Sequence, residues 1–248
     1  MPHYLDVELS KNKKAEMADT PEEAWFTAVD FRNAKSPRHP GFDAQLEANN
    51  EMKRELILPW ITSVVEGKRV LDLFCANGAF SAEAALAGAK EVVGIDFSPE
   101  RIEVAQFLAS TLEDSVACNF TFMSGDVYEL PNLVSEPFDV VIALGGLYHV
   151  ANPPYVLTKI RSVTKERFIV QTSNILSSPG NWGRFEIRED WTGEGFTSLR
   201  GGHGAWSLTP ECFQAMLVHA RFQELESLRP PLPQLQRFPW YCSLAKPV

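Results

Sequence analysis

Apolar runs alternate with amphipathic stretches through the middle of the chain. Five runs have the length and composition of buried strands, and a turn or a helically spaced stretch follows each of them. The runs cover residues 69–74, 91–97, 120–126, 138–146 and 167–173, and the clearest helical stretches cover 79–89, 99–112 and 153–164. Strands that alternate with helices are typical of parallel sheets with right-handed crossovers. The pattern therefore predicts an α/β fold with a doubly wound, mostly parallel sheet.

The residues before the first predicted strand do not show this alternation of strands and helices. Residues 1–40 are polar and end in a loop rich in Pro and Gly. Residues 42–67 carry apolar positions at helical spacing and predict an amphipathic helix that is broken at Pro59. We therefore expect residues 1–65 to form an N-terminal extension with helices.

After the fifth strand the periodicity stops. Residues 174–208 are rich in Gly, Trp and charge, and a segment of that length predicts a lid over a ligand site. A helix follows, with Thr209 as its N-cap and Pro210 in its first turn. Residues 222–230 and 240–246 predict an antiparallel pair at the edge, which brings the sheet to seven strands.

Composition and net charge limit the classes of partner and of metal or disulfide site that the chain can have. The 248 residues are 45% hydrophobic, enough for one sizeable core, and the formal net charge is −9. Binders of nucleic acid need basic surface, so this charge makes nucleic acid an unfavoured partner. Four widely spaced cysteines predict neither a metal finger nor a disulfide framework. Without a membrane span or a signal-peptide core, we expect a cytoplasmic protein, and nothing in the sequence indicates its oligomeric state.

The first strand runs into a turn that carries candidate chemistry. Asp72 interrupts the apolar run "VLDLF", and the small residues up to Gly78 form a turn before the next helix. A buried acid without a partner is costly, so Asp72 either is satisfied within the core or meets a ligand. The stretch lacks the G-x-G-x-x-G of dinucleotide-binding folds. It resembles the first motif of class I S-adenosylmethionine-dependent methyltransferases, with Phe74 and Ala76 in place of two glycines.

This resemblance implies a cofactor site for S-adenosylmethionine, with S-adenosylhomocysteine as the product. Asp72 would hold the cofactor's ammonium, and the turn amides and the helix N-terminus would hold its carboxylate. The turn residues assigned to the cofactor are Phe74, Ala76, Asn77 and Gly78. The resemblance also implies a single methyltransferase domain over 1–248, with 1–65 as an extension, 66–173 as the cofactor-binding half, 174–208 as the lid, and 209–248 as the last helix and edge strands.

Acids stand at the ends of the next two strands. Asp96 would accept both ribose hydroxyls, a role known for acids about 20 residues beyond such a turn. The resemblance implies that Phe97 and Val127 contact the adenine ring and that Asp126 binds the amino group of the adenine. Each acid alone also suits a turn or a helix cap, and Asp96 stands two residues before Ser98.

The fourth strand ends in "LGGLYHV", where the resemblance implies that Leu144 and Gly145 face the cofactor's sulfonium. This string, followed by two prolines, is similar to small-molecule methyltransferases and to enzymes that modify the wobble uridine of transfer RNA. His149 is the candidate base that removes a hydroxyl proton from the acceptor, although it could equally only shape the pocket. Tyr148 is the candidate wall beside the sulfonium.

The insertion supplies further candidates. Its tryptophans and carboxylates suit a saccharide or polyol, whose faces stack on rings while its hydroxyls seek acceptors. Glu186, Asp190 and His203 are the catalytic candidates there, with a self-packed surface lid as the alternative. A divalent metal would find donors in Asp139, His149 or Asp190, but no paired ligand spacing supports one.

Three functions follow. The leading hypothesis is an O-methyltransferase acting on a polar small molecule. The first alternative is a methyl- or carboxymethyltransferase of the transfer RNA wobble uridine, whose carboxylated cofactor would need an arginine such as Arg32 or Arg184. The second alternative is a cofactor-binding protein without chemistry.

Overall fold

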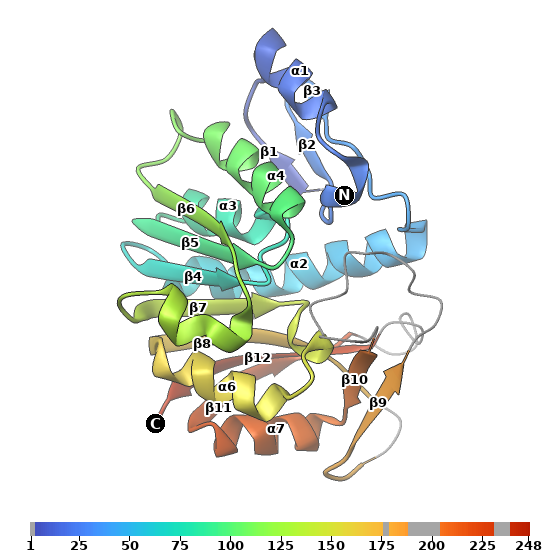
Figure 1. The fold of residues 1–248 in the computed structure, drawn as a ribbon, viewed down its shortest axis with the longest axis vertical. Coiled ribbons are helices and arrows are strands. Elements are labelled where there is room, and N and C mark those ends of the chain that lie inside the picture. The colour runs from blue at the N-terminus through green and yellow to red at the C-terminus, as the bar shows by residue number, and fades with distance from the viewer. Residues whose placement is uncertain (1–2, 176–178, 188–203, 231–238) are drawn as a thin grey trace. The chain divides into compact units, whose positions relative to one another are not determined.

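The computed structural model describes residues 3–175, 179–187, 204–230 and 239–248 of the chain (Figure 1). The chain divides into two compact units, Met1–Ser124 and Gly125–Val248. Each unit has its own strands and helices, and each is described in turn.

Three parallel strands form the centre of the first unit, and the turns after them carry predicted site residues. They are β4 (Arg69–Leu73), β5 (Glu91–Asp96) and β6 (Asn119–Ser124), in that order across the sheet. The connecting helices are α3 (Ala79–Leu86) and α4 (Pro99–Ser110). Leu73 pairs with Ile95, so the carboxyl ends of β4 and β5 lie side by side. Ligands of parallel sheets bind at this end.

Helix α2 (Ala44–Val64) precedes these strands and continues through Pro59. The break expected at that proline was wrong. Proline removes one helix hydrogen bond, but Ile57, Trp60 and Ile61 around it are at most 7% exposed. Burial of this apolar face holds the helix together across the missing bond.

The N-terminal extension contains strands as well as the expected helices. Three short strands build a small sheet: β1 (His3–Leu5) runs parallel to β2 (Val29–Phe31), and β3 (Ala34–Lys35) antiparallel to it. Between β1 and β2 lie α1 (Lys11–Ala18) and the 3-10 helix η1 (Glu22–Ala24).

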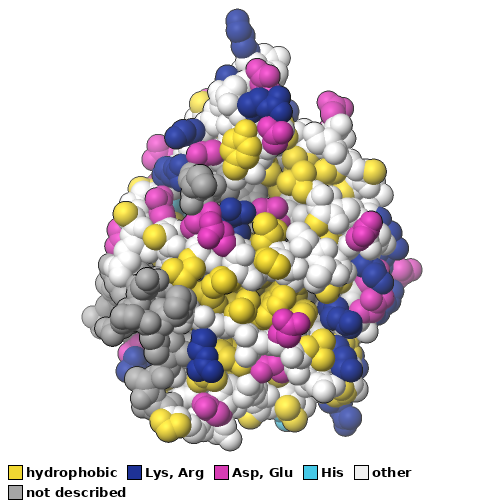
Figure 2. Space-filling model, turned by 180° about the vertical axis from the view of Figure 1, so that it is seen from behind, with side chains coloured by type: hydrophobic (Ala, Val, Ile, Leu, Met, Phe, Trp, Pro, Cys, Tyr) yellow, Lys and Arg dark blue, Asp and Glu magenta, His cyan; other side chains and the backbone are white. Residues whose placement is uncertain are grey.

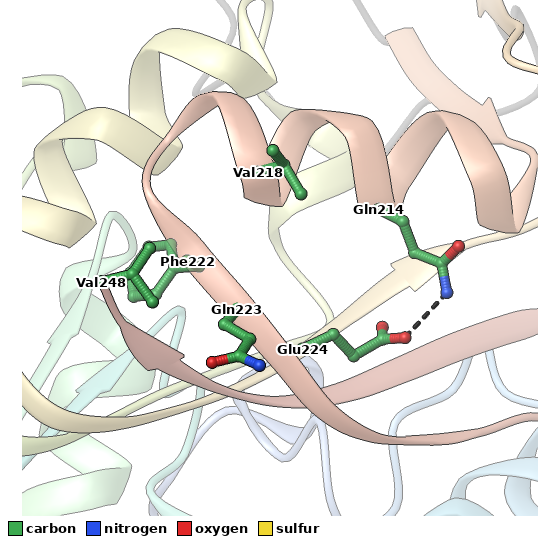
Figure 3. Close-up of a pocket in the computed structure, with 6 residues that line it drawn as sticks. All are labelled: Gln214, Val218, Phe222, Gln223, Glu224 and Val248. Carbon is green, nitrogen blue, oxygen red and sulfur yellow. Dashed lines mark hydrogen bonds between the residues drawn. The ribbon is translucent and has the colours of Figure 1, made fainter.

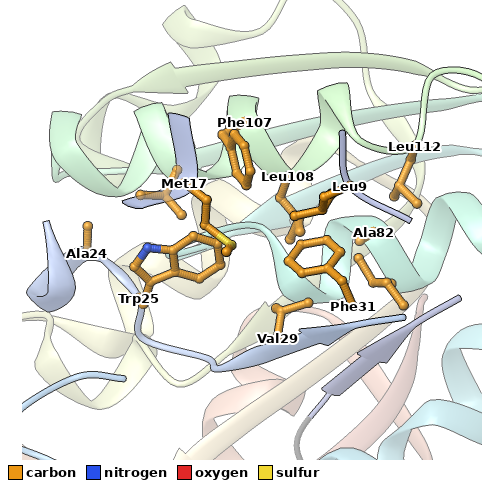
Figure 4. Packing of buried hydrophobic residues seen from close by; sticks show 12 residues of the cluster. Leu9, Met17, Ala24, Trp25, Val29, Phe31, Ala82, Phe107, Leu108 and Leu112 are labelled. Atoms are coloured by element: carbon orange, nitrogen blue, oxygen red, sulfur yellow. The ribbon is translucent and has the colours of Figure 1, made fainter. Parts of the chain in front are cut away.

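A buried cluster joins this N-terminal segment to α3 and α4 (Figure 4). Trp25 is fully buried, its ring meets Phe107 edge-on at 6.1 Å between centroids, and its Nε1 donates to Thr20 Oγ1 at 2.7 Å. The other members are Leu5, Leu9, Met17, Ala24, Val29, Phe31, Ala82, Val104, Leu108 and Leu112. The extension is therefore part of the core of the first unit.

The second unit contains four strands of one sheet in the order β11-β12-β8-β7. Parallel neighbours β7 (Phe138–Leu144) and β8 (Thr164–Ser173) are followed by antiparallel β12 (Trp240–Pro247) and β11 (Phe222–Leu228). The helices are α5 (Leu130–Leu133), α6 (Pro153–Ser162) and α7 (Pro210–His219), with the 3-10 helices η2 (Val127–Glu129) and η3 (Leu147–His149).

The α/β fold class is confirmed. Three strands of the first unit and four of the second are the seven expected, mostly parallel with antiparallel strands at the C-terminal edge. Thr209 caps α7 as expected, since its Oγ1 accepts the Cys212 N–H at 3.2 Å. Within the described ranges, no helix is both long and apolar enough to cross a membrane.

The insertion contains two strands that its sequence did not predict. Strands β9 (Gly183–Ile187) and β10 (Gly204–Leu208) pair antiparallel, and Phe185 packs on Trp206 with centroids 5.1 Å apart. Residues 188–203 between them lie outside the described part of the chain.

Trp25→Ala should destabilise the protein by about 3–5 kcal/mol, because it removes the largest side chain of the N-terminal cluster. Urea unfolding followed by circular dichroism measures this loss. Trp182→Ala is the matched control, since Trp182 is 40% exposed and should cost far less. Equal losses for both variants would contradict the claim that the extension belongs to the core.

Candidate active site

The turn after β4 keeps a left-handed backbone at each position where the resemblance expects glycine. The φ angles are +58° at Phe74, +48° at Ala76 and +75° at Gly78. A side chain in this region costs roughly 1–2 kcal/mol, so the first two residues hold strained conformations. Local contacts fix them: Cys75 N–H donates to Ile95 O at 3.2 Å, and Gly78 N–H to Cys75 O at 2.8 Å.

Gly78 is needed here for a second reason. A Cβ built at this position would lie 3.0 Å from the Cβ of Ala105 on α4. The absence of a side chain thus lets the turn approach α4 while the chain enters α3. The turn has the shape of the cofactor-binding turn that the resemblance implies, without its first two glycines.

Asp72 is buried inside β4, at 2% exposure. Burial raises the pKa of its carboxyl to about 7; the hydrogen bond from Ser81 lowers it, and the charge of Asp96 raises it. Ser81 Oγ donates to Asp72 Oδ2 at 2.7 Å. Among the described residues no cation pairs with this carboxylate, which fits a ligand that brings a positive charge.

Asp96 joins the two strand ends. It is 4% exposed, and it accepts the N–H of Ala76 at 2.9 Å through Oδ2 and the N–H of Ser98 at 3.1 Å through Oδ1. The helix cap of α4 is Ser98, whose Oγ accepts the Arg101 N–H at 3.3 Å. Each carboxylate oxygen has a second lone pair, so Asp96 can still accept ribose hydroxyls.

The side chain of Asn77 faces the N-terminal segment. It is fully buried, its Oδ1 accepts the N–H of Thr27 and its Nδ2 donates to the carbonyl of Thr27, both at 2.9 Å. Only its backbone is left for a cofactor. We name these paired bonds the Asn77–Thr27 clamp. Neither Thr27 nor Ser81 was a sequence candidate; Ser81 could have been found from its place in the first turn of the helix after Gly78.

Phe97, the predicted adenine contact, is half-buried and lies beside a cation. The guanidinium of Arg101 sits over the ring of Phe97 at 5.7 Å and over that of Phe26 at 5.3 Å. Phe26 belongs to the N-terminal segment, so this stack is a second link between that segment and the end of β5.

The second unit holds the remaining candidates at strand ends. Asp126 is exposed and caps η2, because it accepts the Tyr128 N–H at 2.9 Å. Val127 is buried. Leu144 ends β7 and is buried, and Gly145 follows with φ +99°. All four residues thus lie at or just after the ends of the strands that the sequence predicted. Their roles toward the cofactor stay predictions.

Tyr148 and His149 lie in η3, both half-buried, with ring centroids 4.2 Å apart. The backbone N–H of His149 donates to the carbonyl of Gly146 at 2.9 Å. Helix η3 packs against β8 and β10. The two rings therefore lie near the carboxyl end of β8 and beside the described part of the insertion.

Of the lid candidates, only Glu186 can be described. It lies on β9, and Arg184 on the same strand pairs with it at 3.2 Å. Asp190 and His203 lie outside the described residues. Arg32, the other arginine proposed for a carboxylated cofactor, is exposed and pairs with Asp6 at 2.8 Å. Among the described residues no group of three His, Cys, Asp or Glu side chains could hold a metal ion.

A surface hollow of about 510 Å³ lies between α7 and β11 (Figure 3). None of the predicted site residues lines it. Its lining residues are Gln214, Val218, Phe222, Gln223, Glu224 and Val248, and Gln214 donates to Glu224 at 2.7 Å across it. This hollow is therefore separate from the candidate site.

The charges on the face seen in Figure 2 are mixed. Lys and Arg side chains lie among Asp and Glu side chains there, without a continuous basic area. That face has no surface of the kind that follows a nucleic-acid backbone.

Comparison with known proteins agrees with the turn and its acids. A family model described as a methyltransferase domain matches residues 65–190. The chain belongs to the methyltransferase domain family. The match covers β4 to β8, including Asp72, Asp96 and His149.

Curated relatives of this methyltransferase-family chain act on different substrates. The ubiquinone biosynthesis O-methyltransferase of Dechloromonas aromatica (strain RCB) is 32% identical over 143 residues, which are 55% of this chain and 60% of that protein. The tRNA U34 carboxymethyltransferase of Pseudomonas aeruginosa (strain LESB58) is 35% identical over 115 residues, which are 46% of this chain and 33% of that protein. The match thus spans less than two thirds of each relative.

Solved structures share the fold over nearly the whole methyltransferase-family chain. The N-terminal domain of EvdMO1 with bound SAH has a TM-score of 0.67 at 16% identity and covers 98% of both chains. Magnesium protoporphyrin IX methyltransferase from Synechocystis PCC 6803 with bound SAM has a TM-score of 0.65 at 16% identity, covering 98% of this chain and 100% of that one. These bound molecules support S-adenosylmethionine as the cofactor.

Asp72→Asn should change how stability depends on pH. The pKa of Asp72 is about 7 in the fold and higher than in the unfolded chain. Ionisation therefore costs stability, and wild-type stability should fall relative to the variant as pH rises from about 4 to about 7 and level off above that. Urea midpoints at several pH values measure this difference in stability.

Calorimetry should also show S-adenosylhomocysteine binding wild type more tightly as pH rises through 7, because its ammonium favours ionised Asp72. Parallel profiles for both proteins would contradict this role.

Gly78→Ala should cost more stability than Gly67→Ala. Both glycines have positive φ, but a Cβ at Gly67 meets nothing within 4 Å. We expect Gly67→Ala to cost about 1 kcal/mol from its backbone alone, and Gly78→Ala about 1–3 kcal/mol more from crowding against α4. Only Gly78→Ala should weaken binding of S-adenosylhomocysteine. If both variants bind it like wild type, the turn does not form the cofactor site.

Proposed function

We propose that this protein is an S-adenosylmethionine-dependent O-methyltransferase that methylates a hydroxyl of a polar small molecule such as a saccharide or polyol. The observation that carries the proposal is the turn after β4. It combines a buried carboxylate with a raised pKa, Asp72, with a left-handed backbone at Phe74, Ala76 and Gly78. An amino-acid group carries an ammonium and a carboxylate. Asp72 attracts the ammonium, and the turn amides attract the carboxylate.

The cofactor residues take distinct roles in this proposal. Asp72 holds the ammonium, and the backbone of residues 74–78 holds the carboxylate. Asp96 accepts the ribose hydroxyls, while Phe97, Asp126 and Val127 recognise the adenine. Leu144 and Gly145 line the sulfonium end. When bound, S-adenosylmethionine supplies a methyl carbon already activated by its sulfonium leaving group.

The acceptor residues have the task of aligning a hydroxyl and removing its proton. His149 takes that proton on an imidazole nitrogen as the new carbon–oxygen bond forms, and Tyr148 walls the site. Glu186, Asp190 and His203 of the insertion accept hydrogen bonds from the acceptor's other hydroxyls. Two half-buried rings in η3, next to β8 and β10, support this arrangement.

Modification of the transfer RNA wobble uridine is the second candidate. The 35% identity to a tRNA U34 carboxymethyltransferase favours it. The net charge of −9 disfavours it. So do the exposed, acid-paired Arg32 and Arg184. Salt-sensitive, sub-micromolar binding of transfer RNA would make this the better proposal.

A protein that binds the cofactor without methyl transfer is the third candidate. One solved neighbour is the [4+2]-cyclase SpnF, with a TM-score of 0.57 at 17% identity. A fold therefore does not dictate the reaction. Transfer of labelled methyl from S-adenosylmethionine to any acceptor of a saccharide, polyol and catechol panel would exclude this candidate.

His149→Ala should lower the single-turnover rate by about 10²–10⁴-fold, because the acceptor proton loses its base. His149→Asn keeps a hydrogen-bonding group but cannot carry the proton away, so it should be as slow as the alanine variant. Labelled methyl transfer to the best acceptor of the panel measures both rates. Affinity for S-adenosylhomocysteine is the control and should stay within twofold of wild type.

Near-normal rates in both variants would remove His149 from the reaction. A normal rate in His149→Asn alone would mean that His149 only orients the acceptor. In either case the base would have to come from Glu186, Asp190 or His203.

A further inference from the structure

Buried polar atoms without hydrogen-bond partners gather in one part of the second unit. Among the described residues five such side-chain atoms occur. Four of them belong to three residues: Thr172 Oγ1, Trp206 Nε1, and both Oδ1 and Nδ2 of Asn174. Leaving a buried polar group unpaired is costly, so a cluster of them indicates a missing partner.

Asn174 is the centre of this cluster. Its side chain is 2% exposed, and neither end of its amide has a partner. Its backbone is held on both sides, because its N–H donates to the Pro239 carbonyl at 3.1 Å and a bridge joins it to Leu208. The backbone cannot shift to satisfy the side chain without breaking these bonds.

The cluster lies at the functional end of its strand. Thr172 and Asn174 stand at the carboxyl end of β8, where α/β sheets bind ligands. Trp206 is on β10, and η3 with Tyr148 and His149 packs against both β8 and β10. The unpaired atoms and the candidate base thus belong to neighbouring elements of one unit.

The chemistry of the cluster selects the kind of ligand. Asn174 offers one acceptor and one donor group, Trp206 offers a donor, and the hydroxyl of Thr172 can do either. A hydroxyl group both donates and accepts, so adjacent hydroxyls can satisfy all of them. A carboxylate would face Asn174 Oδ1 with no proton to donate, and an ammonium would leave the indole N–H unpaired.

Entry requires β10 to move, because these atoms are closed to solvent. Three contacts join β10 to the end of β8: an isolated bridge between Asn174 and Leu208, one bond from Ile175 N–H to Leu208 O at 2.8 Å, and a hydroxyl contact between Ser173 and Ser207 at 3.5 Å. Separating these elements breaks few hydrogen bonds between described residues, and a ligand would replace them.

We propose that Asn174, with Trp206 and Thr172, forms the recognition site for a neutral acceptor with adjacent hydroxyl groups. This rests on the proposed function and names its substrate class. Asn174 binds the hydroxyl next to the one that His149 deprotonates.

Asn174→Leu tests the proposal because leucine has nearly the same shape and no polar atoms. If the amide waits for a ligand, the variant should be at least as stable as wild type in thermal unfolding. Its kcat/KM for catechol or D-fucose, whichever wild type methylates, should fall by about 10- to 100-fold. Its affinity for S-adenosylhomocysteine should stay within twofold. Asn77→Leu is the contrast: it breaks the Asn77–Thr27 clamp and should lower the Tm.

A second measurement uses wild type, so it does not depend on how the variant folds. In protein labelled with ¹⁵N at Asn and saturated with S-adenosylhomocysteine, catechol or D-fucose should shift the side-chain amide signals of Asn174, and benzoate should not. Asn174→Leu assigns these signals.

The outcomes separate the two claims. Loss of stability in Asn174→Leu comparable with that in Asn77→Leu, or unchanged kcat/KM, would overturn the recognition site. Shifts with benzoate alone, or with none of the three probes, would overturn the hydroxylated class. Failure of wild type to bind S-adenosylhomocysteine would instead overturn the proposed function.

Discussion

The carboxylate of Asp96 is the interaction on which the candidate cofactor site depends. One oxygen accepts the Ala76 amide of the turn after β4, and the other accepts the Ser98 amide at the start of α4. Charge-assisted bonds of this kind are about twice as strong as neutral ones. They hold Ala76 in a backbone conformation that its side chain disfavours. Asp96 thus stabilises at Ala76 a backbone conformation that glycine adopts without strain.

Asp72 depends on the same arrangement. The turn and α3 enclose it, and the nearby Asp96 adds a second negative charge. The two acids lie in one buried region, and Asp72 is easier to ionise once a cation is present. A site of this kind stores unfavourable electrostatic energy in the empty protein and releases it on binding. In the proposed function, this energy favours a ligand that brings a positive charge.

The residues of the candidate site in or just after the strands could be predicted from the sequence. Asp96 and His149 could be placed because each follows a long apolar run, and Asp72 because it interrupts one. The shape of the turn could not be derived, because Phe74 and Ala76 are left-handed only through contacts made with β5. Strands β1, β2 and β3 have three residues or fewer, which is too short for a periodic signal. Strands β9 and β10 pair across residues 188–203, and the continuity of α2 at Pro59 depends on burial. All of these are tertiary effects.

The Asn77–Thr27 clamp bears on where the folding unit begins. The family match starts at residue 65, after the N-terminal extension. A fragment cut there would leave the buried amide of Asn77 without either of its bonds and would uncover Phe107 and Leu108 on α4. Such a fragment would contain the residues shared with the family and still lack part of its own core. The folding unit of this chain therefore extends further toward the N-terminus than its family resemblance does.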